Sequence, residues 1–115
     1  MSFKINIEKK TTNNTYYRNV LYTNSDMQLV VMNLLPNEKI DREKHNGSQF
    51  IRVEEGSGIA IVKNKRYILK NGSGLIINPN TYHNIIAGDK GMKLYSIYTP
   101  PQHKKGTKEK SKKDD

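Results

Sequence analysis

Short apolar runs separated by turn-forming residues constrain the fold of this chain more than any other feature of its sequence. The runs recur about every 8–12 residues and are rich in Val, Ile and Tyr, which is typical of strands. No stretch keeps an apolar pattern at helical spacing. Short strands without helices between them predict an all-β fold, an antiparallel sandwich or a closed barrel, for which the jelly roll is the natural candidate. The expected strands are Tyr16–Tyr22, Met27–Leu35, Gln49–Val53, Gly58–Val62, Arg66–Leu69, Leu75–Ile77, His83–Ile86 and Met92–Tyr98.

The two ends of the chain differ in composition from its middle. Residues 1–14 mix Lys, Thr and Asn without clear periodicity, and we interpret them as an arm or an edge strand. Residues 15–103 hold the apolar runs and are expected to form one domain. Within them, Val62–Tyr67 predicts a tight hairpin in which Asn64 takes the positive φ of the turn. Residues 104–115, which are mostly small or charged, predict a disordered basic tail.

The absence of cysteine excludes disulfides, thiolate metal sites and cysteine nucleophiles. No run reaches the roughly 18 apolar residues that a membrane span needs. The first residues also lack the apolar core of a signal peptide. We therefore expect a cytoplasmic protein without a membrane partner.

The chain is basic, with a net charge of +9 from 20 Lys and Arg against 11 Asp and Glu. A basic surface and tail fit polyanion binding, whose affinity falls steeply with salt, and this function is kept as an alternative. The Tyr and Phe residues lie in apolar runs rather than among the basic residues. The aromatic platform on which single-stranded nucleic acid stacks is therefore not indicated, and nucleic acid is not the favoured partner.

Four polar residues form the candidate chemical site. Glu43 and His45 are two residues apart, so on an extended strand both side chains leave the same face. Gln49 keeps that parity if the intervening turn does not shift it, and His83 opens a later strand. Two imidazole nitrogens and two oxygens suit a divalent first-row metal ion. By spacing alone, however, a Glu-x-His pair is more typical of a surface ion pair than of a metal site.

Roughly from residue 15 to residue 107, the sequence resembles a small single-domain cupin. The first cupin motif is Gly, five residues, His-x-His, three or four residues, Glu, six residues, Gly. Every spacing is kept here, on Asn37, Glu43, His45, Gln49 and Gly56. The second motif is Gly, five residues, Pro-x-Gly, two residues, His, three residues, Asn. Its spacings fall on Gly72, Asn78, Asn80, His83 and Ala87.

The resemblance implies an antiparallel jelly-roll β-barrel with a divalent metal, Fe, Mn, Ni or Zn, inside it. The implied ligands are Glu43, His45 and His83, with Gln49 as the fourth. Glu43 stands where the motif has His, and Gln49 where it has Glu, so the carboxylate has changed position. The Asn-for-Gly departures are physically mild, because Asn tolerates the left-handed conformation.

Three functions remain open after the resemblance is included. The first is a metal-binding cupin that acts on a small polar molecule in an unidentified reaction. The second is a metal-free cupin that binds a carbohydrate or another small polar ligand, and the third is the polyanion binder described above. Cupins often pair through strand edges, so we also expect a homodimer in which the segment Phe3–Ile5 could extend a partner's sheet.

Overall fold

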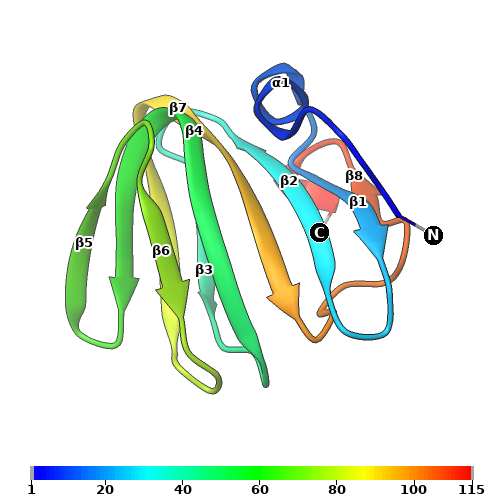
Figure 1. The fold of residues 1–115 in the computed structure, drawn as a ribbon. Coiled ribbons are helices and arrows are strands. Elements are labelled where there is room, and N and C mark those ends of the chain that lie inside the picture. Colours follow the sequence, from blue (N-terminus) through cyan, green and yellow to red (C-terminus); the bar gives the residue numbers. More distant parts are fainter. Residues whose placement is uncertain (1, 115) are drawn as a thin grey trace.

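The computed structural model describes residues 2–114, which form one eight-stranded antiparallel sheet with short helical segments near both ends (Figure 1). The helices are α1 (Ile7–Asn13) and the 3-10 helix η1 (Lys112–Asp114). The strands are β1 (Arg18–Thr23), β2 (Gln28–Leu34), β3 (Lys39–Glu43), β4 (Ser48–Val62), β5 (Lys65–Leu69), β6 (Gly74–Ile77), β7 (His83–Thr99) and β8 (Lys108–Glu109). The expected all-β jelly roll is confirmed.

Two long strands organise the sheet. The main strand order is β5-β4-β7-β2-β1-β8, with β3 paired to β7 and β6 paired to β4. One half of β7 pairs with β2 and the other half with β3, so the same strand belongs to two layers that face each other. The main path ends at β5 and β8, which do not pair with each other, so the hydrogen-bonded sheet is not a closed barrel.

Two glycines allow β4 and β7 to pass from one layer to the other. Gly56 has a φ of 95° and Gly91 a φ of 76°, values that most L side chains avoid. The β4–β7 register shifts on both sides of Gly56, which is the signature of β-bulges. In the sequence, each of these strands is predicted as two shorter ones, because the apolar alternation is interrupted at these bends.

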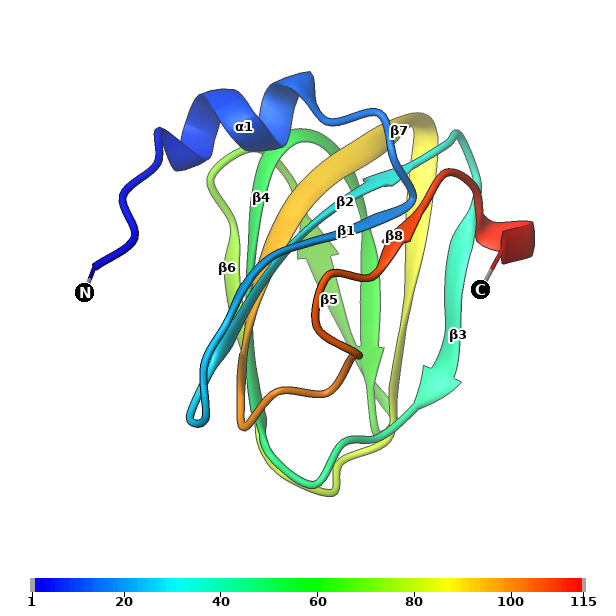
Figure 2. The same ribbon diagram turned by 90° about the vertical axis from the view of Figure 1, so that its right-hand side faces the viewer.

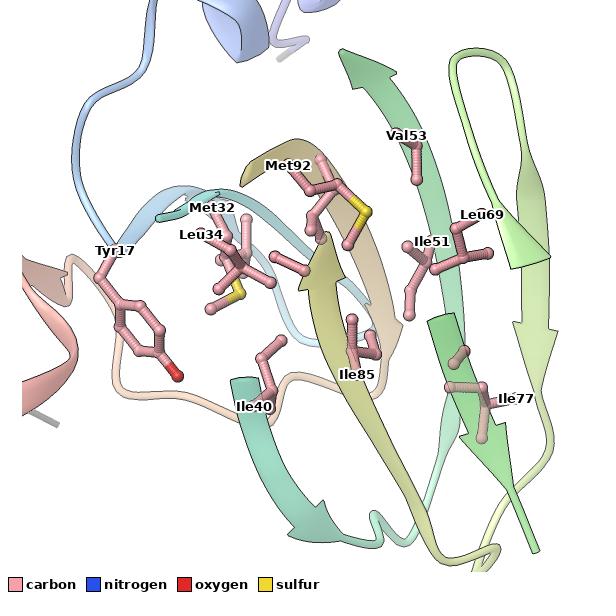
Figure 3. Close-up of a cluster of buried hydrophobic side chains, with 14 of the residues drawn as sticks. Tyr17, Met32, Leu34, Ile40, Ile51, Val53, Leu69, Ile77, Ile85 and Met92 are labelled. Atoms are coloured by element: carbon pink, nitrogen blue, oxygen red, sulfur yellow. The ribbon is translucent and has the colours of Figure 1, made fainter. Parts of the chain in front are cut away.

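The core lies between the two layers. Alternate residues of the long strands point inward, and Ile51, Val53 and Leu94 are fully buried. Figure 3 shows these layers closing over a cluster that also contains Met32 and Ile85. Burying one such side chain contributes about 1.5–3 kcal/mol, so this cluster holds the layers together.

The expectation of an arm or edge strand at residues 1–14 is wrong for its second half, which forms α1. The Asn6 side chain accepts a hydrogen bond from the backbone nitrogen of Lys9 and so caps the helix. Thr11 is fully buried, and α1 packs against β7, β4 and β2. The helix lies at the end of the molecule where β4 and β7 bend (Figure 2).

The expectation of a disordered tail at residues 104–115 is also wrong for the residues that the structure describes. Strand β8 pairs with β1, and the buried guanidinium of Arg18 forms an ion pair with Glu109. Lys112 then contacts Asp41 of β3 at 3.3 Å. The segment therefore crosses the open side of the sheet between β1 and β3 (Figure 2). The segment is rich in lysine, so its composition predicted disorder and gave no indication of these specific pairings.

Positive φ angles occur where two of the motif's glycines have been replaced. Asn37 has a φ of 63° and Asn80 a φ of 58°, so both asparagines adopt the expected left-handed conformation. In the hairpin between β4 and β5, the positive φ belongs to Lys63, at 57°, and not to Asn64 as we expected. Among the described residues, no helix has the length and apolar character that a membrane crossing demands.

Candidate metal centre

Strand pairing brings together three of the four predicted site residues. Glu43 ends β3 and lies opposite His83, the first residue of β7, while His45 follows two residues after Glu43. Each residue offers one ligand atom, and these atoms all lie within 4.8 Å of one another. Strand β3, which ends at Glu43, runs toward the end of the molecule away from α1 (Figure 1).

Both imidazoles direct Nε2 at the same carboxylate oxygen. The Nε2 atom of His45 lies 3.4 Å from Oε2 of Glu43, and that of His83 lies 3.8 Å from it. The two ring centroids are 5.5 Å apart. Both Nε2 atoms are buried, and neither has a hydrogen-bond partner within residues 2–114. Buried nitrogens without partners are costly, so this arrangement requires an explanation.

The backbone fixes the tautomer of one imidazole. Nδ1 of His83 lies 2.9 Å from the carbonyl oxygen of Thr81, and a carbonyl can only accept a hydrogen bond. Nδ1 therefore carries the proton, and Nε2 of the neutral ring keeps its lone pair. Metal-binding histidines commonly show this arrangement, in which the second nitrogen is held by a backbone carbonyl.

The site becomes more exposed from His83 toward Glu43. The side chain of His83 is 2% exposed, that of His45 is 12% exposed and that of Glu43 is 33% exposed. Glu43 therefore forms the solvent-facing side of the cluster, while the histidines form its inner wall.

Burial and charge act in opposite directions on Glu43. Burial raises the pKa of its carboxyl group, but the nearby imidazoles of His45 and His83 and the charge of Arg18 lower it by more. The net result is a pKa below the ordinary value of 4.5, so the carboxylate is ionised at neutral pH. A carboxylate oxygen and two imidazole nitrogens form a donor set that fits a divalent first-row metal ion.

Gln49, the fourth predicted residue, is not in the cluster of three and is connected to it through Tyr98, which packs against His45. It is buried and pairs with Tyr98 across β4 and β7. Its Nε2 atom donates to Ser96 Oγ at 3.1 Å and to Tyr98 Oη at 3.2 Å. These bonds orient the amide, and its Oε1 atom has no hydrogen-bond partner in the described part of the chain.

Two tyrosines differ in their relation to the site. Tyr98 is buried in the core and also packs edge-on against His45, with ring centroids 5.3 Å apart. Burial raises the pKa of its hydroxyl, and the charge of Glu43 raises it further. Tyr82, by contrast, is exposed and lies beneath the cations of Arg42 and Lys44. The β4–β7 register, which sets Tyr98 opposite Gln49, brings Tyr98 to the site, and residue spacing alone does not reveal it.

Two further polar side chains lie outside the cluster. Arg52 pairs with Glu54 at 3.4 Å. His103 is not one of the three clustered residues. Its ring nevertheless lies near the site, with its centroid 6.5 Å from that of His45.

Comparisons with known proteins identify the family. The family model described as "Cupin domain" matches residues 30–98. The mimivirus protein L612, from Acanthamoeba polyphaga mimivirus, is 39% identical over 110 residues, which cover 90% of this chain and 69% of the viral protein. Bacillus subtilis YrkC is 37% identical over 120 residues, covering 97% of this chain and 64% of YrkC.

A solved structure is similar over almost the whole chain. BH2720 from Bacillus halodurans superposes with a TM-score of 0.96 at 34% sequence identity, covering 99% of this chain and 92% of that one. The chain spans about two thirds of the length of L612 and YrkC, which are therefore longer proteins. The family model covers more than half of the chain, and the jelly roll agrees with it: the chain belongs to the cupin family.

Proposed function

We propose that this cupin binds one divalent metal ion through Glu43, His45 and His83, with Gln49 as a fourth ligand. The observation that carries the proposal is the pair of buried Nε2 atoms directed at one carboxylate oxygen. Two ligand atoms about 2.1 Å from one ion, at tetrahedral or octahedral angles, are about 3.0–3.4 Å apart. The separations of 3.4 and 3.8 Å between Nε2 and Oε2 are close to that range.

The protein groups have distinct roles in this proposal. Glu43 supplies negative charge, and the carbonyl of Thr81 holds His83 with its lone pair toward the ion. Ser96 and Tyr98 orient the amide of Gln49, whose oxygen is left to coordinate. A bound Fe, Mn, Ni or Zn ion would act as a Lewis acid toward a small polar molecule.

Metal analysis of the purified protein tests this function. The protein is reconstituted in turn with Fe, Mn, Ni and Zn, freed of excess metal and examined by elemental analysis. We expect about one ion per chain for at least one metal, and none for the triple variant Glu43→Ala, His45→Ala, His83→Ala. Asp89→Asn, which alters an exposed carboxylate elsewhere, is the control and should retain metal.

A folded wild-type protein that retains no metal would overturn the proposal. That result would favour the alternative, a metal-free cupin that binds a carbohydrate or another small polar ligand. Titration calorimetry of the metal-free protein with neutral sugars would then test the alternative directly.

The homodimer expected from the sequence remains a prediction. The segment Phe3–Ile5, which was expected to extend a partner's sheet, forms no strand in this chain, and Phe3 stacks on Tyr22 with centroids 4.9 Å apart. Pairing through this segment would therefore require it to leave Tyr22. The molar mass from light scattering distinguishes a monomer from a dimer.

A further inference from the structure

The C-terminal segment, residues 100–114, carries a third imidazole to the candidate metal centre. The His103 ring packs edge-on against Tyr98, with centroids 5.2 Å apart, and against His45 at 6.5 Å. Its Nε2 atom is buried. This partly buried side chain is therefore packed against the aromatic rings beside the cluster and does not belong to a solvated tail.

A buried glutamine of β2 fixes the backbone of His103. Gln28 is 0% exposed, and its Oε1 accepts hydrogen bonds from the backbone nitrogens of Gln102 and His103 at 3.3 and 3.0 Å. Its Nε2 donates to the His103 carbonyl at 2.8 Å and to Thr23 Oγ1 at 3.0 Å. Burying an amide is costly unless its hydrogen bonds are made. The backbone of this segment provides hydrogen-bond partners for the Gln28 amide, and the same bonds fix the position of His103.

The rest of the segment is anchored on both sides of the site. The ion pair of Arg18 with Glu109 attaches it to β1, and that of Lys112 with Asp41 attaches it to β3. The segment is thus attached to both β1 and β3, and His103 is the imidazole that it places beside His45 and Tyr98.

His103 lies outside the group of side chains whose atoms could share one ion. The ligand atoms of Glu43, His45 and His83 all lie within 4.8 Å of one another, and His103 is not a member of this group. Its ring centroid is 6.5 Å from that of His45, against 5.5 Å between His45 and His83. It is within reach of a small molecule attached to the ion.

The donors around this position suit an anion bound at the ion. The imidazole of His103 and the hydroxyl of Tyr98 can both donate hydrogen bonds, and their rings pack together with centroids 5.2 Å apart. The positive charge would come from the metal ion, because Arg18 is already paired with Glu109. Hydrogen bonds from such groups to an ionised acceptor contribute more than those to a neutral one.

Building on the proposed metal site, we propose that His103 is a ligand-binding residue that holds a small carboxylate bound at the metal. The segment that carries it would determine which ligands are accepted, without coordinating the ion itself. Acetate serves as the carboxylate probe, and cobalt(II) as the metal, because its visible absorption reports changes in coordination.

The experiment measures cobalt affinity first and acetate affinity of the cobalt-loaded protein second. We expect His103→Ala to weaken acetate binding about ten-fold, corresponding to the loss of one hydrogen bond to a charged group, while cobalt affinity changes less than about two-fold. His103→Gln, which keeps a donor, should recover part of the loss. Lys105→Ala, an exposed change in the same segment, is the control and should bind acetate like the wild type.

Each other outcome has a defined meaning. If acetate affinity is unchanged in His103→Ala and His103→Gln, both folded by circular dichroism, His103 does not bind the carboxylate and the inference is wrong. If His103→Ala lowers cobalt affinity as much as His45→Ala, His103 coordinates the ion and the inference is also wrong. If the wild type binds no cobalt, the proposed metal site fails, and the inference fails with it.

Discussion

Nδ1 of His83 lies 2.9 Å from the carbonyl oxygen of Thr81, two residues earlier in the chain. The contact leaves the lone pair of the neutral ring on Nε2, which is buried and lies 3.8 Å from Oε2 of Glu43. The turn before β7 therefore fixes the orientation of the His83 ring, with Nε2 directed toward Glu43. This orientation is the basis of the proposed metal site.

The tautomer of His83 can be observed directly. In the metal-free protein at pH 8, we expect the Nδ1–H tautomer, because the Thr81 carbonyl accepts its proton. Long-range proton–nitrogen correlation spectra of the imidazole distinguish the protonated from the unprotonated ring nitrogen. Predominance of the Nε2–H tautomer would show that the backbone does not prepare this residue for a metal.

The lowered pKa of Glu43 predicts a pH-dependent contribution to stability. A carboxyl group whose pKa is lower in the folded than in the unfolded state stabilises the fold above the unfolded value, near 4.5. This contribution is lost as the pH falls through the lower, folded value. In the metal-free protein with chelator, the stability advantage of the wild type over Glu43→Gln should therefore shrink as the pH is lowered from 6 to 3.

Urea unfolding across that pH range measures the effect. Asp89→Asn provides the control, because this carboxylate is exposed and lies outside the site. An advantage over Glu43→Gln that stays constant or grows as the pH falls would contradict the lowered pKa.

Two ion pairs attach the C-terminal segment, and they should differ in their contribution to stability. Arg18 and Glu109 have side chains only 5% and 16% exposed, so Glu109→Gln leaves a buried guanidinium less well compensated and should cost about 3 kcal/mol. Asp41 is 74% exposed in its contact with Lys112, and Asp41→Asn should cost less than about 1 kcal/mol. Equal losses in urea unfolding would mean that burial does not set the strength of the Arg18 pair.

Alanine substitutions at two glycines with positive φ distinguish the energetic cost of backbone strain from that of steric overlap. Gly72 has a φ of 87° and open space around its Cα, so Gly72→Ala should cost about 1–2 kcal/mol for the conformation alone. At Gly56, with a φ of 95°, an added Cβ would overlap the backbone of Gly91 and Met92. Gly56→Ala should therefore cost at least about 1 kcal/mol more than Gly72→Ala in thermal or urea unfolding. Similar costs would show that the bend between the layers is not tightly packed.

The sequence predicts the jelly roll because turn residues and apolar alternation are local properties of the chain. It also predicts Glu43, His45 and His83 as a group, since the spacing of two motifs requires no knowledge of the register. The sequence pattern does not predict the helix α1, because its stability depends on the Asn6 cap and on packing against the sheet. Only one of its side chains, that of Ile7, is apolar, so no apolar stripe at helical spacing is visible in the sequence.

The surroundings of the site depend on strand register and on contacts between distant segments. Tyr98 reaches His45 because β4 and β7 pair with Gln49 opposite Tyr98. His103 reaches the same place because Gln28, 75 residues earlier, binds its backbone. Such contacts leave no periodic signal, and the many lysines of the C-terminal segment suggested disorder instead.

Anomalous diffraction from a metal-reconstituted crystal tests the central proposal most directly. With data collected at the absorption edge of the bound metal, we expect one strong peak about 2.0–2.2 Å from Nε2 of His45, Nε2 of His83 and a carboxylate oxygen of Glu43. A crystal of reconstituted protein with no peak between these three side chains, or with its only peaks on the outer surface, would contradict the proposal.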